Sequence, residues 1–591
     1  MANGFGSLYI GAAGLKTSQN ALNVTANNFA NVNTTGYVRQ QVIQADYNYN
    51  TFDTAASISD QQYGLGVKIG DVVHARDIFL DKAYRTESGR QAFYSATYEA
   101  VDEVYTFYQE LEGEAFQDSI EDFWQSFQEF AKAPDDTVNQ NLVVQKANLF
   151  LSRASAVYTG LSNYQSNINT QIKDDINRIN ELGETIYQLN MEIHKIEAGG
   201  IETAMTLRDE RDNALDELAT YVDISYTENP EGIVKVSVEG VEFVDELRCY
   251  QMGMLKDDIT GFVTPYWEHL SEPELEKYDL VFSYTTEISS DLGTDIGELR
   301  ALILARGDRV ASYQDVEGLT SNEYNRSTVD HIATGMSVML TAEAQLDQLI
   351  HGIVTAINDL FCPNTEASNL TGLTGGATLT ATGADGKTYT ITEDTLLLDT
   401  ENCSVGVDGK IPPTELFSRI GTERYTEVEV TNEDGTTSTY YLYNEEDPRD
   451  SDKQYTLKSL KINDVLNGME TLLPHLTQNG NVNYDLGEKL ASVWSSELLT
   501  LDPDDTNMLS FMDYYDNMIG EYGTLGSLYE STSSSLSGTV ETVDNQRAQV
   551  IGVSSDEELT KMIKYQNAYN ASSRYINVID EMIEHLITQL G

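Results

Sequence analysis

The sequence predicts a multidomain α+β protein with α-helical coiled-coil arms at its termini, a discontinuous bundle of long helices, and inserted β-rich outer domains. Apolar residues recur at alternating steps of three and four in residues 5–29 and return at helical spacing in 559–590. Another helical periodicity runs through residues 161–196. The period changes to two near residue 233, and residues 365–465 carry Asp-Gly pairs typical of hairpin turns.

These patterns divide the chain into four expected parts. Because each helical region is amphipathic and needs a shared core, helices distant in sequence should pack together. The expected parts are a terminal coiled-coil assembly domain (1–50 with 552–591), a helical domain (51–230 with 295–362 and 484–551), a small β-rich segment (231–294) and an inserted β-rich outer domain (363–483).

Both terminal helices have an apolar stripe but no core of their own. The N-terminal stripe includes one polar residue, Gln19, and as a continuous helix it would be roughly 37 Å long. We expect the two helices to pair with each other and with neighbouring copies, through Phe5, Leu8, Leu15, Leu22, Phe29, Tyr575, Ile579, Met582 and Leu586. Two ordinary core helices of a globular protein remain an alternative, since periodicity does not tell where a stripe is buried.

A polar motif follows the first helix. Its residues are Asn27, Asn28, Asn31, Gly36, Tyr37, Arg39 and Gln40. Gly36 can adopt the positive φ that ends a helix. The motif therefore predicts a helix end, a tight turn and an extended stretch.

The N-terminal run, with its Asn-rich helix end and Thr-Thr-Gly-Tyr turn, resembles the family of bacterial flagellar rod, hook and hook-associated proteins. The tail from Gly552 to Leu559, followed by 563–569, resembles the matching C-terminal signature. The run Leu207 to Leu218, which leads into an alternating strand, resembles the hook-associated branch and not the shorter rod proteins. A lone Arg-Asp pair there would usually be a solvated helix face, so the whole string carries the resemblance.

The net charge is strongly acidic. At −59, the chain should repel nucleic acid and anionic membranes. Residues 1–50 carry only Lys16, Arg39 and Asp46 as charged side chains, so the acid is concentrated in the middle of the chain. A nearly uncharged arm is compatible with close packing of many copies.

The cysteines and the chain start bear on the compartment. Cys249, Cys362 and Cys403 are too few and odd in number for a disulfide framework, which alone favours the cytosol. No cleavable signal sequence and no run of 18 apolar residues is visible. The resemblance implies an extracellular protein of the flagellum that leaves through the flagellar type III exporter without cleavage and is not inserted in a membrane.

The sequence predicts no catalytic, cofactor-binding or metal residues. The seven histidines are scattered, without metal-ligand spacing. Acidic residues 445–452 could bind calcium, but they lack the spacing of a twelve-residue loop, which favours a solvated charge run.

The resemblance implies a structural protein at the junction of hook and filament, which is not an enzyme. Implied partners are further copies in a ring or short helical assembly, hook protein, another hook-associated protein or flagellin, and an export chaperone at the C-terminal helix. Two alternatives remain open: a hook or distal-rod protein, and a secreted enzyme or adhesin domain (365–465) carried on a flagellar scaffold.

Overall fold

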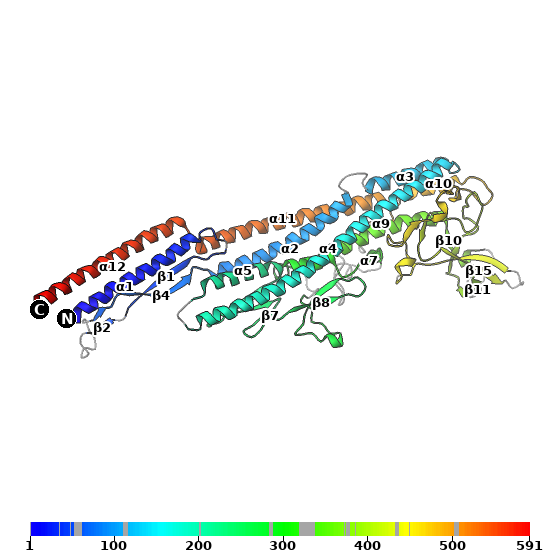
Figure 1. Cartoon of the computed structure of the whole chain (residues 1–591). Coiled ribbons are helices and arrows are strands. Elements are labelled where there is room, and N and C mark those ends of the chain that lie inside the picture. Colours follow the sequence, from blue (N-terminus) through cyan, green and yellow to red (C-terminus); the bar gives the residue numbers. More distant parts are fainter. Residues whose placement is uncertain are drawn as a thin grey trace.

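The computed structural model shows an elongated molecule with the paired terminal helices at one end and a β-rich insert at the other (Figure 1). It describes residues 2–34, 36–47, 49–51, 62–109, 116–199, 203–282, 288–317, 337–370, 373, 379–383, 386–431, 437–447, 449–501 and 507–590. The predicted fold class, α+β with long terminal helices and an inserted β-rich part, is confirmed.

The terminal arm is an antiparallel helix pair. Helix α1 (Ala2–Ala30) runs from the tip toward the body, and α12 (Ser555–Leu590) runs back to the tip, so both chain ends lie together (Figure 1). Strand β1 (Gln40–Asp46) pairs with β4 (Val67–His74), and β2 (Tyr49–Thr51) pairs with β3 (Gln62–Gly64). The Thr17 hydroxyl donates to the Val67 carbonyl at 3.0 Å, which fixes β4 against α1.

The body is built from helices that are far apart in sequence. Helix α11 lies along α2, and α4 contacts α2 (Figure 1). The bounds are α2 (Ile78–Gln109), α3 (Phe116–Lys132), α4 (Thr137–Glu197), α5 (Met205–Tyr221), α6 (Glu298–Arg306), α7 (Gln314–Glu317), α9 (Val338–Phe361), α10 (Tyr484–Ser492) and α11 (Phe511–Ile551).

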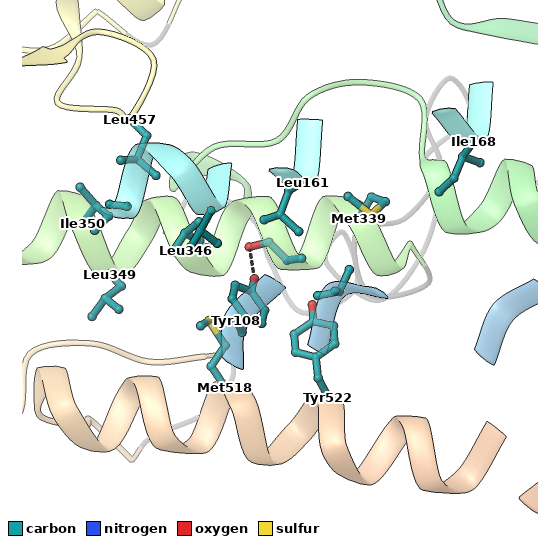
Figure 2. Packing of buried hydrophobic residues seen from close by; sticks show 14 of the residues in the cluster. Tyr108, Leu161, Ile168, Met339, Leu346, Leu349, Ile350, Leu457, Met518 and Tyr522 are labelled. Atoms are coloured by element: carbon teal, nitrogen blue, oxygen red, sulfur yellow. Dashed lines mark hydrogen bonds between the residues drawn. The ribbon is translucent and has the colours of Figure 1, made fainter. Parts of the chain in front are cut away.

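Tyrosines join these helices across the core. The Tyr108 hydroxyl on α2 donates to the Ala342 carbonyl on α9 at 2.8 Å, and Tyr515 on α11 donates to the Tyr108 carbonyl at 2.7 Å. Figure 2 shows Tyr108 beside Leu346 of α9 and Met518 of α11. One contiguous apolar cluster therefore includes residues of α2, α4, α9 and α11.

Helix α4 is longer than the sequence predicts. Its 61 residues form one helix that begins after Asp136, whose carboxylate accepts from the Val138 N–H. The periodicity was evident only after residue 160, but Val143, Phe150 and Val157 are also buried. They extend the stripe toward the insert, where the aromatic residues of α3 cover it.

The small β-rich segment packs beside α4. Strands β5 (Ile224–Glu228), β6 (Val234–Val238) and β7 (Val241–Val244) form one sheet, and β8 (Met252–Lys256) pairs with β9 (Val263–Trp267). Val234, Val236 and Val238 are buried, as the predicted alternation requires.

The regular structure of the outer insert is mainly strand. In its described part, six strands follow the order β10 (Asn364–Glu366), β13 (Leu396–Leu398), β16 (Thr437–Tyr443), β15 (Tyr425–Thr431), β11 (Leu379–Gly383) and β12 (Thr388–Ile391), and β14 (Phe417–Arg419) pairs with β17 (Leu460–Ile462). The predicted turn residues Asp385, Asp434 and Gly435 lie outside the described residues, as do the predicted helix residues 329–336 and the break at 502–505.

Candidate assembly interface and its joint

Helices α1 and α12 approach each other through small side chains of α1. A Cβ atom added to Gly11 would lie 2.7 Å from Ile576 Cγ1, and one added to Gly14 would lie 2.8 Å from Ser572 Oγ. Ser18, Ala21 and Thr25 continue this face and are buried. The spacing is again three and four, so this face is a coiled-coil seam of small residues.

The predicted apolar stripe of α1 lies beside this seam and not in it. Leu8, Leu15 and Leu22 are half-buried, whereas Phe29 is exposed. The side chain of Phe5 lies outside the described residues. The seam was not predicted from the sequence because Gly, Ser and Thr are not counted among the apolar residues. Their heptad spacing is nevertheless visible in the sequence.

On α12, the predicted residues divide between two faces. Ile579 is half-buried, and the Tyr575 ring lies against Gly11 of α1, 3.2 Å from where a Cβ there would stand, whereas Met582 and Leu586 are exposed to 57% and 56%. Met582 and Leu586 belong to a set of large apolar side chains that stay exposed along α12, which we call the outward stripe and which comprises Leu559, Ile563, Val578, Met582, Leu586 and Ile587.

The polar motif after α1 forms the joint between the arm and the body, and buried Asn28 is its centre. Asn28 Nδ2 donates to the Gln40 carbonyl at 2.9 Å and to Glu558 Oε2 at 3.2 Å. Asn28 Oδ1 accepts from the Tyr37 hydroxyl at 2.8 Å and from the Gln40 N–H at 3.0 Å. All four hydrogen-bonding sites of this amide are occupied, so α1, β1 and α12 meet at one side chain.

The neighbouring motif residues complete the turn. Asn31 donates to the Asn27 carbonyl at 3.0 Å and accepts from Thr34, while Asn27 donates to the Tyr37 hydroxyl at 3.3 Å. Gly36 has φ of +77°, as predicted, and any Cβ there would overlap Asn213 of α5. Only glycine fits this turn.

Arg39 binds the connection between α11 and α12. Its N–H donates to the Ile551 carbonyl at 2.9 Å, and its guanidinium lies 3.2 Å from Glu557 and 3.4 Å from the Val550 carbonyl. The N-terminal and C-terminal signatures of the sequence are therefore in direct contact.

Asp209 of α5 connects the joint to the body. Its carboxylate accepts from the Val38 N–H at 3.2 Å and lies 3.3 Å from His74 Nδ1. Burial raises the pKa of Asp209 to about 6, and burial beside Arg76 and Arg208 lowers the pKa of His74 to about 4. At neutral pH the contact therefore joins a neutral imidazole to a carboxylate. Burial, with Asp209 and Glu558 nearby, also raises the pKa of Tyr37 to about 12.

Next to the joint, three arginines and three aspartates alternate in a closed ring. Asp81 contacts Arg76 at 3.1 Å and Arg547 at 2.7 Å. Asp216 contacts Arg547 at 2.5 Å and Arg85 at 2.7 Å. Asp212 contacts both Arg76 and Arg85, which closes the ring. The ring, which we call the Arg–Asp ring, joins α2, α5 and α11.

The two arginines of α5 are also engaged. Arg208 contacts Glu197 at 2.7 Å and Glu228 at 2.6 Å. Arg211, which is 2% exposed, donates to Asn190 and to the Gly232 carbonyl. Such a charge pattern usually forms a solvated helix face, but in this helix the two arginines are bound to other parts of the body.

The acidic residues 445–452 are not a uniform solvated run either. Glu446 points inward, with its carboxylate 2.9 Å from His351 Nε2 and 3.0 Å from the Tyr313 hydroxyl. Asp447 and Asp450 pair with Lys453. Within the described residues, no three His, Cys, Asp or Glu side chains are placed to hold a metal ion, and none of the helices there is long and apolar enough to cross a membrane.

Comparison with known proteins identifies three matching family models. Residues 101–374 match the flagellar hook-associated protein FlgK helical domain. Residues 549–590 match the flagellar basal body rod FlgEFG protein C-terminal model, and residues 8–37 match the flagella basal body rod protein model. The latter two ranges are the terminal helices that form the arm.

Full-length relatives agree with these matches. Flagellar hook-associated protein 1 of Bacillus subtilis is 24% identical over 598 residues, covering 100% of this chain and 99% of the relative. The protein of the same name from Salmonella typhimurium is 21% identical, covering 97% and 98%. A solved structure, the flagellar hook junction protein FlgK from Burkholderia pseudomallei, aligns with a TM-score of 0.47 at 13% identity, covering 79% of this chain and 99% of that one. From the ordered family matches and these end-to-end relatives, we conclude that the chain belongs to the family of flagellar hook-associated protein 1 and is a structural protein of the bacterial flagellum.

Proposed function

We propose that this chain links hook to filament by self-assembly through its terminal arm, in a ring or short helical array. The observation that carries the proposal is the outward stripe of α12, whose large apolar side chains stay exposed after α1 and α12 have paired. Burying one such side chain contributes roughly 1.5–3 kcal/mol, and every copy repeats the contact. The interface would use Leu8, Leu15, Leu22 and Phe29 of α1 with Tyr575, Ile579, Met582 and Leu586 of α12, and Phe5 beyond them.

The joint gives the arm a fixed direction relative to the body. Asn28, Arg39 and Asp209 together bind the arm to α5 and to the α11–α12 connection. A defined direction is what a closed symmetric assembly needs, because each copy must present the same surface at the same angle. We propose the four-part division predicted from the sequence as the corresponding functional division, with the arm innermost and the insert outermost.

The proposed partners follow from the proposed position of the chain at the junction between hook and filament. Neighbours above and below a junction would be hook protein on one side and another hook-associated protein or flagellin on the other. Before assembly, the outward stripe of α12 would need cover, which an export chaperone bound at this helix would supply. The proposed location is the extracellular hook–filament joint, reached without a cleavable signal peptide, and we propose no enzymatic activity.

The test is incorporation into flagella of cells that lack their own copy. Leu586→Asp places a charge in the outward stripe and should abolish incorporation, while the folded body and its thermal unfolding stay unchanged. Lys564→Ala, on exposed α12 surface, is the matched control. Lys561 is unsuitable, since it pairs at 2.6 Å with Glu558, the partner of Asn28. Normal incorporation of Leu586→Asp would refute assembly through the terminal arm.

A further inference from the structure

The first turn of α2 holds two large apolar side chains in solvent. Ile78 is 65% exposed and Phe79 is 85% exposed. The turn is rigid, because Asp77 caps it by accepting from the Phe79 N–H at 2.9 Å. Adjacent apolar side chains on a rigid surface turn indicate a surface that another molecule covers.

Lys82 stands one turn after Phe79 on the same face of α2. Its side chain is exposed, and its ammonium lies 5.8 Å from the centre of the Tyr226 ring. Among the described residues, no carboxylate lies within ion-pair distance of Lys82. This face of α2 therefore offers two apolar side chains followed by an available positive charge.

The start of α12 offers the complementary pattern. Leu559 and Ile563 are exposed, and Asp556, one turn before Leu559, is an exposed carboxylate on the same face. Helix α2 runs from the joint into the body, whereas α12 runs from the joint to the tip (Figure 1). The steps from Phe79 to Lys82 and from Leu559 to Asp556 therefore both lead toward the body. Each step spans three residues, about 4.5 Å of rise.

The two surfaces lie at the same level of the molecule, because Arg39 contacts the chain next to each: its carbonyl accepts from the Ala75 N–H at 3.0 Å, and its guanidinium lies 3.2 Å from Glu557. Ile78 lines a cavity of 590 Å³ together with residues 71–74 of β4. Strand β4 lies on α1 at Thr17, while α12 contacts α1 at Gly11 and Gly14 (Figure 1). A head-to-tail contact between copies needs two different patches of this kind, since a rotation that closes a ring brings one patch onto the other.

We propose that Ile78, Phe79 and Lys82 of one copy dock on Asp556, Leu559 and Ile563 of a second copy of this chain. In that register Phe79 packs against Leu559, and Lys82 pairs with Asp556. The occupant is a second copy because the start of α12 in this chain has the matching carboxylate and the matching spacing of apolar side chains. It also lies at the same level along the molecule as the first turn of α2. The inference rests on the proposed self-assembly and adds a contact between the start of α12 and a surface of the body, the first turn of α2.

The test uses charge reversal in the full chain, with incorporation into flagella as the readout. Lys82→Asp alone and Asp556→Lys alone should each reduce incorporation roughly fivefold, the scale of one lost ion pair. The double reversal should restore it. Lys410→Asp, a reversal at an 80% exposed side chain of the insert, is the control and should have no effect.

A mixture of the two single variants distinguishes contact between copies from contact within one. In an alternating assembly every introduced aspartate meets an introduced lysine, so the mixture should incorporate better than either variant alone. This rescue also separates the ion pair from the effect of a lysine on the first turn of α12. Full incorporation of both singles, or no rescue by either the double reversal or the mixture, would overturn the docking. Those outcomes leave the arm proposal standing, which the Leu586→Asp variant tests separately; if that variant incorporates normally, the arm proposal fails instead.

Discussion

Asn28 and Glu558 are 530 residues apart in sequence, yet their side chains are hydrogen-bonded at 3.2 Å in a buried position. The Glu558 carboxylate also pairs with Lys561 at 2.6 Å. The contact joins the last turn of α1 to the first turn of α12. It is therefore the point at which the two ends of the chain are held in register.

We predict that Asn28→Ala loosens the arm and leaves the body intact. The substitution removes four hydrogen bonds and leaves Glu558 Oε2 and the backbone N–H and carbonyl of Gln40 without this partner, at a cost of about 1–3 kcal/mol. Amide exchange should accelerate in residues 18–30 and 555–570, with no change in α2 or α4. Asn23→Ala, on exposed α1 surface, is the control. Equal exchange in both variants would show that Asn28 does not hold the joint.

The Arg–Asp ring predicts strong coupling between residues that are distant in sequence. Arg547→Gln removes one cation and leaves Asp81 and Asp216 buried without it, which should cost about 3–5 kcal/mol in urea unfolding. Adding Asp216→Asn should recover part of that loss, so the two changes should be far from additive.

The matched control for the ring is an exposed ion pair. Arg178 contacts Glu217 at 2.7 Å, but both side chains are at least 40% exposed. Arg178→Gln should cost no more than about 1 kcal/mol. If Arg178→Gln and Arg547→Gln lower the free energy of unfolding by similar amounts, closure of the Arg–Asp ring adds nothing to stability.

Buried Glu343 on α9 predicts a pH dependence. Burial raises its pKa from 4.5 to about 8, and Asp315 and Asp347 nearby act in the same direction. The unfolded chain loses the carboxyl proton of Glu343 near pH 4.5, and the folded chain loses it only near pH 8. The contribution of Glu343 to the free energy of unfolding is therefore complete below pH 4.5 and falls as the pH rises to 8.

Glu343→Gln should remove this dependence. The amide oxygen can still accept from the Ala311 N–H, as Glu343 does at 2.9 Å. Relative to the parent, the variant's free energy of unfolding should therefore rise steadily between pH 5 and pH 8. Urea unfolding of both proteins at pH 5, 6.5 and 8 measures this difference. A constant difference would indicate that Glu343 is ionised throughout.

The coiled-coil seam of small residues on α1 predicts a steric effect. Gly11→Val would force its side chain into Ile576 and separate the two helices. Helicity of the arm and incorporation into flagella should both fall, and adding Ile576→Ala should recover part of each. Ala12→Val, one residue along on exposed surface, should be harmless. If Gly11→Val is also harmless, the helices in solution are further apart than in this structure.

Local periodicity was enough to predict the fold class and most helices. The stripe of α4 and the alternation of β6 are visible in sequence because each repeats over neighbouring residues. The small seam was not predicted, since Gly11 and Gly14 stabilise by allowing close approach and bury almost no apolar surface of their own.

The buried charges could not be predicted for a different reason. The Arg–Asp ring draws on three separate segments, and nothing local shows that Arg547 meets Asp216, 331 residues earlier. The sequence did single out the charged run in α5, but charge runs are usually solvated. Only the tertiary structure turns those aspartates inward.

The insert leaves and rejoins the body at neighbouring points. Helix α9 ends at Phe361 and α10 begins at Tyr484, and these two helices contact each other. The Trp124 indole donates to the Ala491 carbonyl and fixes the return point on α3. The insert itself divides into two parts. Phe417 and Leu457 belong to the apolar cluster of the helical body, whereas Ala381, Val428 and Val430 of the six-stranded sheet form a small cluster of their own. A change of size or shape confined to that outer sheet would therefore leave the helical body, and both ends of the chain, in place.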